Sequence, residues 1–269
     1  MAATMAAFLT ACTNEAGEFT NDEERDVLVS LSFSPYDVSP MTRAAASIAG
    51  IATHLDVWII NGDDVTDIHQ TSSESDFGSF SVTLDKTKTY TMHAVAHRCA
   101  DDATLKDGVI SFPEDKVTHS MVYTQTFTPT KDMQLTCLMQ RIVGCFRFEI
   151  TDDIPSAVVK FRFTIANVYD RWNVSSGGTH SLDRVSTISY GGTSSIFNVY
   201  AIVTDAQTTH TVTIDALDAN DAVVKSRQFA DVPLRNGWRT QYSGTFFTDA
   251  PITTTFTVDD WQDYEVVNF

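Results

Sequence analysis

The chain has 269 residues, 43% of them hydrophobic and 20% charged, which is enough for two ordinary domains or one large β domain. Its 18 Lys and Arg residues face 35 Asp and Glu residues, and the resulting formal net charge of -17 disfavours binding to nucleic acids and anionic membranes. No window of roughly 18 apolar residues occurs, so the sequence predicts no transmembrane helix.

Residues 1–12 have the pattern of a lipoprotein signal segment. The run is apolar and rich in small residues, and Leu9-Thr10-Ala11-Cys12 has the form of a bacterial lipobox. Cys12 is therefore the predicted lipidation site, and the lipid would anchor the protein to the outer membrane. No Lys or Arg precedes the apolar run, unlike in an ordinary signal peptide. The alternative is a frayed N-terminus with an incidental cysteine.

Residues 13–25 form a polar segment directly after the predicted lipidated cysteine. The segment carries five acidic residues and one basic residue, with almost no apolar ones. Such a composition predicts a flexible, solvated tether. A tether at this position would hold a folded body away from the membrane.

Alternating apolar and polar residues predict strands through the rest of the chain. The first strand, from Val27 to Phe33, places Val27, Val29, Leu31 and Phe33 on one face. Only Thr42 to Ile51 has a pattern compatible with a short helix. Further predicted strands cover residues 54–60, 77–84, 90–99, 121–127, 133–138, 142–150, 159–165, 195–203, 209–217, 222–229, 239–246, 252–258 and 264–269.

This succession of strands, separated by turn-forming residues, predicts an all-β fold built from sandwiches. The best internal boundary is near residues 140–154, where Thr151 to Pro155 form a turn cluster. We therefore expect an N-terminal β-sandwich domain over 26–141 and a C-terminal β-sandwich domain over 142–269.

The sequence contains no HExxH, GxSxG, P-loop or GxGxxG motif, so we expect neither catalysis nor a cofactor. His93 and His97 share a strand face but lie ~13 Å apart in an extended chain, too far to share a metal ion. His97 and Cys99 are closer, but a single pair falls short of a zinc site.

Two groups of aspartates have the residue type that Ca²⁺ prefers. Neither reproduces an EF-hand pattern, so turn or solvated-loop roles are the favoured interpretation and no metal site is predicted. The groups are Asp63, Asp64 and Asp67, and Asp215, Asp218 and Asp221.

Three cysteines follow Cys12, namely Cys99, Cys137 and Cys145, and no CxxC pair is present. They are compatible with one disulfide plus a free thiol, or with three buried thiols. Of the four tryptophans, Trp58 lies in an apolar strand and is predicted to be buried.

Several segments together resemble the fimbrillin-type lipoproteins of Bacteroidales, the subunits of the type V pilus. The resemblance spans nearly the whole chain, although each motif is short and degenerate. It is carried by the lipobox, Val27 to Phe33, Ser39 to Ala44, Tyr90 to Ala96, Leu138 to Val143, Val232 to Gly244, which is the most specific block, and the tryptophan of Asp260-Trp261.

The resemblance implies two tandem transthyretin-like β-sandwich domains, export as a lipoprotein, and assembly by strand exchange. In polymerising members of the family an arginine-specific protease cuts after the first strand, and a donor strand from another subunit fills the place of the strand that leaves. Here the cut would fall between Arg43 and Ala44. The alternative for Arg43 is a plain surface arginine. Arg235, Arg239 and Tyr242, in the most specific block, are interpreted as structural.

Two functions follow as hypotheses. The first is a structural subunit of a surface fimbria (type V pilus) that takes part in adhesion, with other subunits and a host or bacterial surface ligand as partners. The alternative is a surface lipoprotein that binds carbohydrate in a glycan-uptake system. A removable strand over an apolar groove would favour the first, and an exposed pair of aromatic side chains would favour the second.

Overall fold

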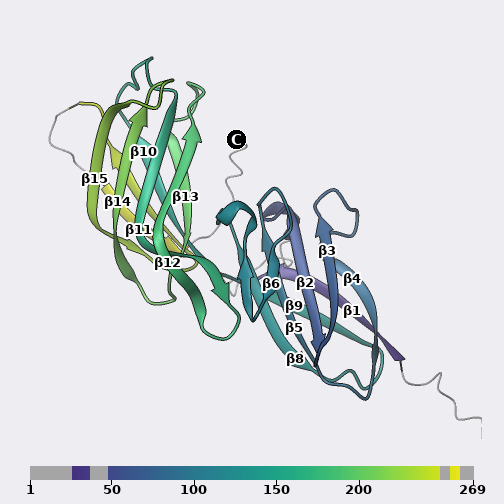
Figure 1. The fold of residues 1–269 in the computed structure, drawn as a ribbon. Coiled ribbons are helices and arrows are strands. Elements are labelled where there is room, and N and C mark those ends of the chain that lie inside the picture. The colour runs from purple at the N-terminus through teal and green to yellow at the C-terminus, as the bar shows by residue number, and fades with distance from the viewer. Residues whose placement is uncertain (1–25, 37–47, 249–254, 261–269) are drawn as a thin grey trace, which may run out of the picture.

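A computed structural model of the chain describes residues 26–36, 48–248 and 255–260, and for 255–260 it describes the backbone alone (Figure 1). The described residues form strands, with two short 3₁₀ helices, η2 (Ile48–Gly50) and η3 (Pro113–Asp115). Figure 1 shows two β-sandwiches lying end to end. The structure confirms the predicted all-β fold of β-sandwiches. The domain bounds at 141/142 stay a prediction.

The first sandwich contains seven strands in the order β3-β2-β5-β8-β9-β1-β4. Only two residue pairs join β8 to β9, and there the sheet folds over, so that β4, β1 and β9 face β3, β2, β5 and β8 across one apolar core. The strands are β1 (Asp26–Pro35), β2 (His54–Asn61), β3 (Asp64–Thr71), β4 (Ser79–Asp85), β5 (Tyr90–His97), β8 (Met121–Phe127) and β9 (Met133–Arg141).

The second sandwich has the core order β15-β14-β11-β13-β10-β16-β17, and β12 pairs with β11. Its core is rich in phenylalanine, with Phe146, Phe161 and Phe163 fully buried. The strands are β10 (Val143–Ile150), β11 (Lys160–Asn173), β12 (Gly177–Ser189), β13 (Ile196–Ile202), β14 (Thr208–Leu217), β15 (Val223–Leu234), β16 (Trp238–Gly244) and β17 (Thr255–Asp260).

The two sandwiches repeat one topology. In the first, β1 pairs antiparallel with β4 and parallel with β9. In the second, β10 pairs antiparallel with β13 and parallel with β16 in the same way. The opposite layers also correspond, because the order β3-β2-β5-β8 matches β12-β11-β14-β15. Among the described strands, β17 alone has no counterpart in the first sandwich.

A hairpin of β6 (Thr104–Lys106) and β7 (Val109–Ser111) joins the two sandwiches. It leaves the first sandwich after β5, and β7 pairs with β11 of the second. An apolar cluster surrounds this junction and includes Trp58, Ile110 and Ile202. The connection between the sandwiches is therefore a packed interface with its own hydrogen bonds.

Of the segment with the helical pattern, only residues 48–51 are described, and 48–50 form the 3₁₀ helix η2. In the part of the chain that the structure describes, no helix is long and apolar enough to cross a membrane.

Candidate functional site: the first strand

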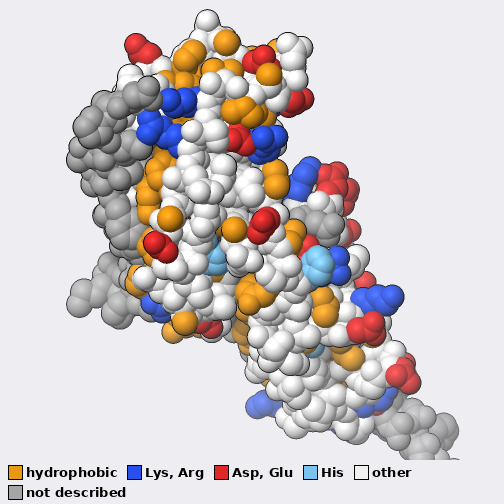
Figure 2. All heavy atoms as spheres, turned by 60° about the vertical axis from the view of Figure 1, so that its left-hand side comes forward, with side chains coloured by type: hydrophobic (Ala, Val, Ile, Leu, Met, Phe, Trp, Pro, Cys, Tyr) orange, Lys and Arg blue, Asp and Glu red, His pale blue; other side chains and the backbone are white. Residues whose placement is uncertain are grey.

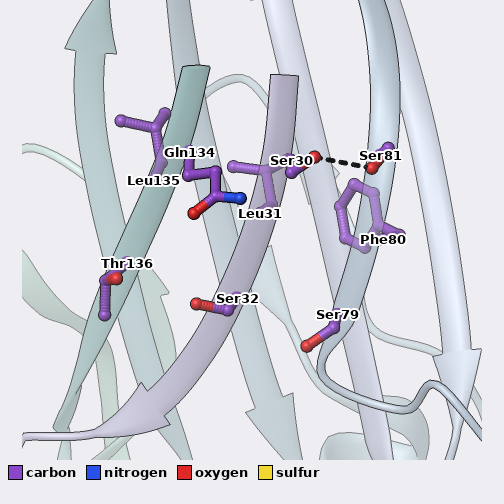
Figure 3. A pocket seen from close by; sticks show the side chains of 9 residues that line it. All are labelled: Ser30, Leu31, Ser32, Ser79, Phe80, Ser81, Gln134, Leu135 and Thr136. Carbon is purple, nitrogen blue, oxygen red and sulfur yellow. Dashed lines mark hydrogen bonds between the residues drawn. The ribbon is translucent and has the colours of Figure 1, made fainter. Parts of the chain in front are cut away.

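Strand β1 lies in the middle of its layer, between β4 and β9. Seven residues from Asp26 to Ser32 pair with β4, and seven from Val29 to Pro35 pair with β9. Figure 3 shows β1 passing between these two strands. Both edges of β1 are therefore hydrogen-bonded, and its departure would leave two strand edges without partners.

The inner face of β1 forms part of the core. The side chains of Val27, Val29, Leu31 and Phe33 are 8%, 0%, 2% and 4% exposed. The Phe33 ring stacks on Phe80 of β4, with the ring centroids 5.9 Å apart. The predicted alternation of this strand is thus present, with one face buried in the sandwich.

The space that β1 fills is here called the β1 groove. Its walls are apolar on both sides because the partners of the inner-face residues are themselves apolar. The walls are Phe80, Val82 and Leu84 on β4, and Met133, Leu135 and Cys137 on β9.

Cys137 lies directly opposite Phe33 in the β1–β9 ladder, and its side chain is fully buried. Burial raises the pKa of its thiol to about 12, although a hydrogen bond with Tyr123 acts in the opposite direction. A thiol with so high a pKa stays protonated near neutral pH and reacts slowly. Cys137 is therefore expected to be unreactive in the folded chain, and β1 is one of the elements that bury it.

Apart from the exposed Leu28, the outer face of β1 is mostly polar. Ser30 and Ser32 lie beside serines of β4, and the Oγ atoms of Ser30 and Ser81 are 2.9 Å apart. Figure 3 shows these side chains around a shallow hollow of about 350 Å³, which Gln134 and Thr136 of β9 also line. Leu31, Phe80 and Leu135 also line it, but their side chains pack in or against the core, so this hollow is a weak candidate for a ligand site.

The other predicted processing residues lie outside the described part of the chain. Cys12, the predicted lipidation site, belongs to residues 1–25, and Arg43 and Ala44 belong to residues 37–47. Lipidation and cleavage therefore stay predictions from the sequence.

The remaining cysteines and Trp58 are buried. Cys99, Cys137 and Cys145 are free thiols, which corresponds to the second of the two states that the sequence allowed. Trp58 is 3% exposed, as predicted, and packs in the apolar cluster at the junction.

The residues of the most specific block have structural contacts. The Arg235 guanidinium lies 4.5 Å from the centroid of the Trp238 ring. Tyr242 packs against Phe146 and Phe229 in the core of the second sandwich.

Neither predicted aspartate group gathers around one point. Asp64 lies 3.7 Å from Lys88, and Asp215 is bound by Arg162. Asp218 accepts hydrogen bonds from two backbone N–H groups of its own turn. These contacts fit the structural roles that the sequence favoured.

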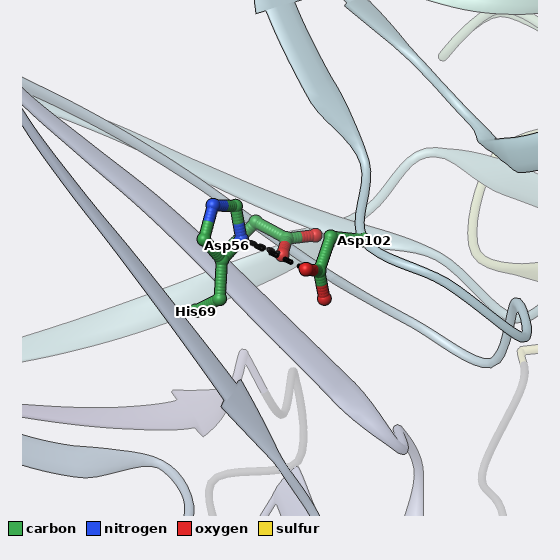
Figure 4. Close-up of side chains that lie close together, drawn as sticks. All are labelled: Asp56, His69 and Asp102. Carbon is green, nitrogen blue, oxygen red and sulfur yellow. Dashed lines mark hydrogen bonds and ion pairs between the residues drawn. The ribbon is translucent and has the colours of Figure 1, made fainter.

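The structure brings together three residues that the sequence analysis did not combine, namely Asp56, His69 and Asp102 (Figure 4). Asp56 and His69 are direct cross-strand partners on β2 and β3. Burial lowers the pKa of His69, but its hydrogen bond with Asp56 and the charges of Asp67, Asp56 and Asp102 outweigh this and raise it overall. The sequence signal that could have pointed to this cluster is Asp56, a carboxylate within an otherwise apolar strand.

A second hollow, of about 620 Å³, opens between β12 and β13. Its lining mixes ring and aliphatic side chains with hydroxyl and amide groups, including Tyr190, Phe197 and Asn198. Within the described residues, Tyr36 is the one aromatic side chain that is exposed, so the aromatic pair expected of a carbohydrate binder is not found there. Acidic side chains are dispersed over the face shown in Figure 2.

The fold defines a class of protein, tandem β-sandwiches with a shared topology, and solved structures share it. A candidate cell adhesion protein from Bacteroides uniformis aligns at TM-score 0.53 and 14% identity, over 89% of this chain and 99% of that chain. One of a group of candidate polysaccharide-binding proteins from Bacteroides thetaiotaomicron aligns at TM-score 0.54 and 11% identity, over 87% and 96%. A candidate adhesin from Bacteroides ovatus aligns at TM-score 0.52 and 11% identity, over 86% and 96%.

At these identities the likeness establishes the fold. No protein-family model matches the sequence, and no curated protein matches it.

Proposed function

We propose that this protein is a non-enzymatic structural subunit of a surface fimbria that assembles by strand exchange and takes part in adhesion. The observation that carries the proposal is the position of β1, a first strand held between two others with its apolar face in the core. Neighbouring folds described as candidate adhesins support a role in adhesion.

The physical argument concerns the state of the subunit without β1. Burying each of the four inner-face side chains contributes roughly 1.5–3 kcal/mol, so the face as a whole contributes about 6–12 kcal/mol. Loss of β1 would uncover the apolar walls of the β1 groove and leave backbone groups of β4 and β9 unpaired. A strand from another subunit would restore both kinds of interaction, as in β-augmentation.

The proposed processing follows from the sequence. Lipid on Cys12 anchors the chain to the outer membrane, and residues 13–25 act as the tether. A cut after Arg43 then separates the lipid, the tether and β1 from the rest of the subunit.

For the donor we propose the segment around β17. In the described residues β17 pairs with β16 alone, and it is the strand without a counterpart in the first sandwich. Its sequence alternates apolar and polar residues over Thr255 to Val258, a pattern that suits a strand with one buried face. Because β17 lies at the edge of its layer, it can leave its own subunit without separating two other strands.

Thiol labelling of Cys137 tests whether the groove opens. After cleavage by an arginine-specific protease, we expect Cys137 to react with a thiol reagent and then to become protected as oligomers form. Cys145 is the internal control. Its side chain is 1% exposed and packs in the junction cluster, away from β1, so it should stay unreactive. Arg43→Lys should resist this protease, remain monomeric, and still be cut by trypsin.

A disulfide across β1 and β4 tests whether β1 must leave. Ser30 and Ser81 are paired residues with their Oγ atoms 2.9 Å apart, so S30C/S81C should form a bond that locks β1. The cut, locked chain should remain monomeric and assemble only after a reductant is added. Equal assembly with the lock closed would contradict strand exchange.

The second candidate function is carbohydrate binding, and the hollow between β12 and β13 is the observation that favours it. Its volume of about 620 Å³ and its mixture of Tyr190 with hydroxyl and amide groups suit a sugar. A glycan array tests this alternative. Specific binding that Tyr190→Ala abolishes, in a chain that forms no oligomers after cleavage, would favour it over the fimbrial subunit.

A further inference from the structure

Asp56 is a buried carboxylate whose two oxygen atoms have different partners. Its side chain is fully buried in β2. Oδ2 accepts hydrogen bonds from His97 Nε2–H at 2.8 Å and from the Ala103 backbone N–H at 2.9 Å. These two donors fix the orientation of the carboxylate and leave Oδ1 directed toward His69. A buried negative charge of this kind requires a positive partner, and His97, which is itself fully buried, supplies one when it is protonated.

The Nδ1 atom of His69 points toward Asp56 Oδ1. Its Nδ1 lies 2.6 Å from Asp56 Oδ1, and its Nε2 lies 3.1 Å from Asp67 Oδ1. A histidine that binds a metal usually donates its other ring N–H to a carboxylate, which fixes the tautomer and the ring orientation. Asp67 is placed to accept that hydrogen bond, so Nδ1, which contacts Asp56 Oδ1 in this structure, is the atom that would bind a metal ion.

Asp102 completes the cluster from a third segment, the loop between β5 and β6. Its Oδ2 lies 3.7 Å from His69 Nδ1, and the ligand atoms of Asp56, His69 and Asp102 are all within 4.8 Å of one another. Figure 4 shows the three side chains converging. The side chains of His69 and Asp102 are 35% and 47% exposed, which leaves a path for an ion and room for a water ligand.

We propose that Asp56, His69 and Asp102 bind a divalent first-row transition metal ion, with Zn²⁺ as the ion to test. One imidazole nitrogen and two carboxylate oxygens, with water in the fourth position, match a zinc coordination sphere. Ca²⁺ and Mg²⁺ prefer oxygen ligands alone, so the histidine discriminates against them.

Binding requires a small movement of His69. Two ligands of a tetrahedral zinc ion at ~2.0–2.1 Å lie about 3.3 Å from each other, whereas Asp56 Oδ1 and His69 Nδ1 are 2.6 Å apart. His69 is half-exposed on β3, at the end of the strand order, and can move outward. The metal ion takes the place of any proton on Nδ1, which is released to solvent.

The consequence of binding is structural. The ion would link β2, β3 and the loop that leads into the β6–β7 hairpin, which pairs with the second sandwich. A bound ion should therefore stabilise the first sandwich and the base of the junction together.

Zinc titration of the metal-stripped full-length chain, in excess Mg²⁺ to occupy nonspecific carboxylates, tests the proposal. We expect one Zn²⁺ per chain and a rise in the midpoint of thermal unfolding. Asp102→Asn should weaken binding more than about tenfold, and Asp67→Asn should weaken it about 10–100-fold through the orientation of His69.

The matched control is Asp101→Asn, which removes the same charge from the neighbouring exposed residue and should bind zinc like the parent chain. Co²⁺ should give visible absorption bands that His69→Gln abolishes, which reports ligation directly. The proposal is overturned if the parent chain takes up no zinc in excess Mg²⁺, or if Asp102→Asn and Asp101→Asn bind it equally.

Discussion

Single residues on β1 differ greatly in what they contribute, although they are neighbours in sequence. Leu31 is 2% exposed and packs in the core of the first sandwich, whereas Leu28 is 48% exposed on the opposite face. The two side chains are identical, so a comparison between them isolates burial from chemistry.

We expect Leu31→Ala to lower the free energy of unfolding by about 2–5 kcal/mol, because it removes buried methyl groups and leaves a cavity. Leu28→Ala should change it by within about 0.5 kcal/mol. Chemical denaturation of both variants measures the difference. Similar losses in the two variants would contradict the described orientation of β1.

Asp152 fixes the segment after β16. Its two carboxylate oxygens accept hydrogen bonds from the backbone N–H groups of Phe246, Phe247 and Thr248, at 2.7–2.8 Å. Burial raises the pKa of Asp152, but these hydrogen bonds outweigh it and lower the pKa overall. The resulting stabilisation is present above the unfolded pKa of about 3.9 and is lost as the pH falls through the folded pKa.

Asp152→Asn should therefore lower the free energy of unfolding by about 1–3 kcal/mol at neutral pH. The difference from the parent chain should shrink as the pH falls below about 4, where the parent carboxyl is itself protonated. Denaturation curves at several pH values test this. A difference that does not depend on pH would argue against the ionised carboxylate as the acceptor.

At the scale of elements, strands with a clear alternation of apolar and polar residues could be predicted from the sequence. Features that depend on how strands pair with one another could not. Period-two alternation located β1, because each residue of a strand is buried or exposed according to its own face. The hairpin of β6 and β7 escaped, because three-residue strands are too short to show a period. The fold class was thus predictable, whereas this hairpin was not, and neither were β3 and β12, which bury few side chains.

The candidate metal site escaped for a related reason. Asp56 and His69 are 13 residues apart in sequence and meet only because β2 and β3 pair in one register. In the sequence, His93 and His97 stand out as a pair on one strand, whereas the partner of His97 in the structure is Asp56 on β2. Alternation gives the face of a residue and does not give the register.

At the scale of the whole molecule, the junction decides whether the two sandwiches behave as one unit. Ile110 on β7 is 1% exposed and lies in the apolar cluster between them. Arg184 of β12 donates hydrogen bonds to the carbonyls of Val117 and Tyr200, on the two sides of the junction.

We expect the parent chain to unfold in one calorimetric transition and Ile110→Ser to split it into two, because the substitution removes apolar contact between the sandwiches. Val65→Ser, at a residue of β3 that is 55% exposed, is the control and should keep the single transition. Two transitions in the parent chain would contradict this coupling.

His119 makes the junction sensitive to acid. It is 6% exposed, stacks on Tyr200 of the second sandwich, and accepts a hydrogen bond from Arg141 Nε–H. Burial, and then the positive charges of Arg141 and Arg98, lower the pKa of His119 well below its usual value. The folded protein therefore resists protonation of this residue.

Because the folded pKa is lowered, the stability that depends on neutral His119 is complete above the unfolded pKa of about 6.5 and falls as the pH drops below it. Between about pH 8 and pH 5, the range in which histidine titrates, the contribution of His119 to the unfolding free energy should decline toward the acid end. His119→Gln should flatten that decline. An unchanged slope in the variant would assign the acid sensitivity to other groups.

The two ladders that flank β1 also have a mechanical consequence. A tension applied along the strand axis loads the hydrogen bonds to β4 and β9 in shear, many at a time, whereas a force across the strand would peel them one by one. If subunits assemble as proposed, a donor strand in this position would bear tension along its axis through many hydrogen bonds at once.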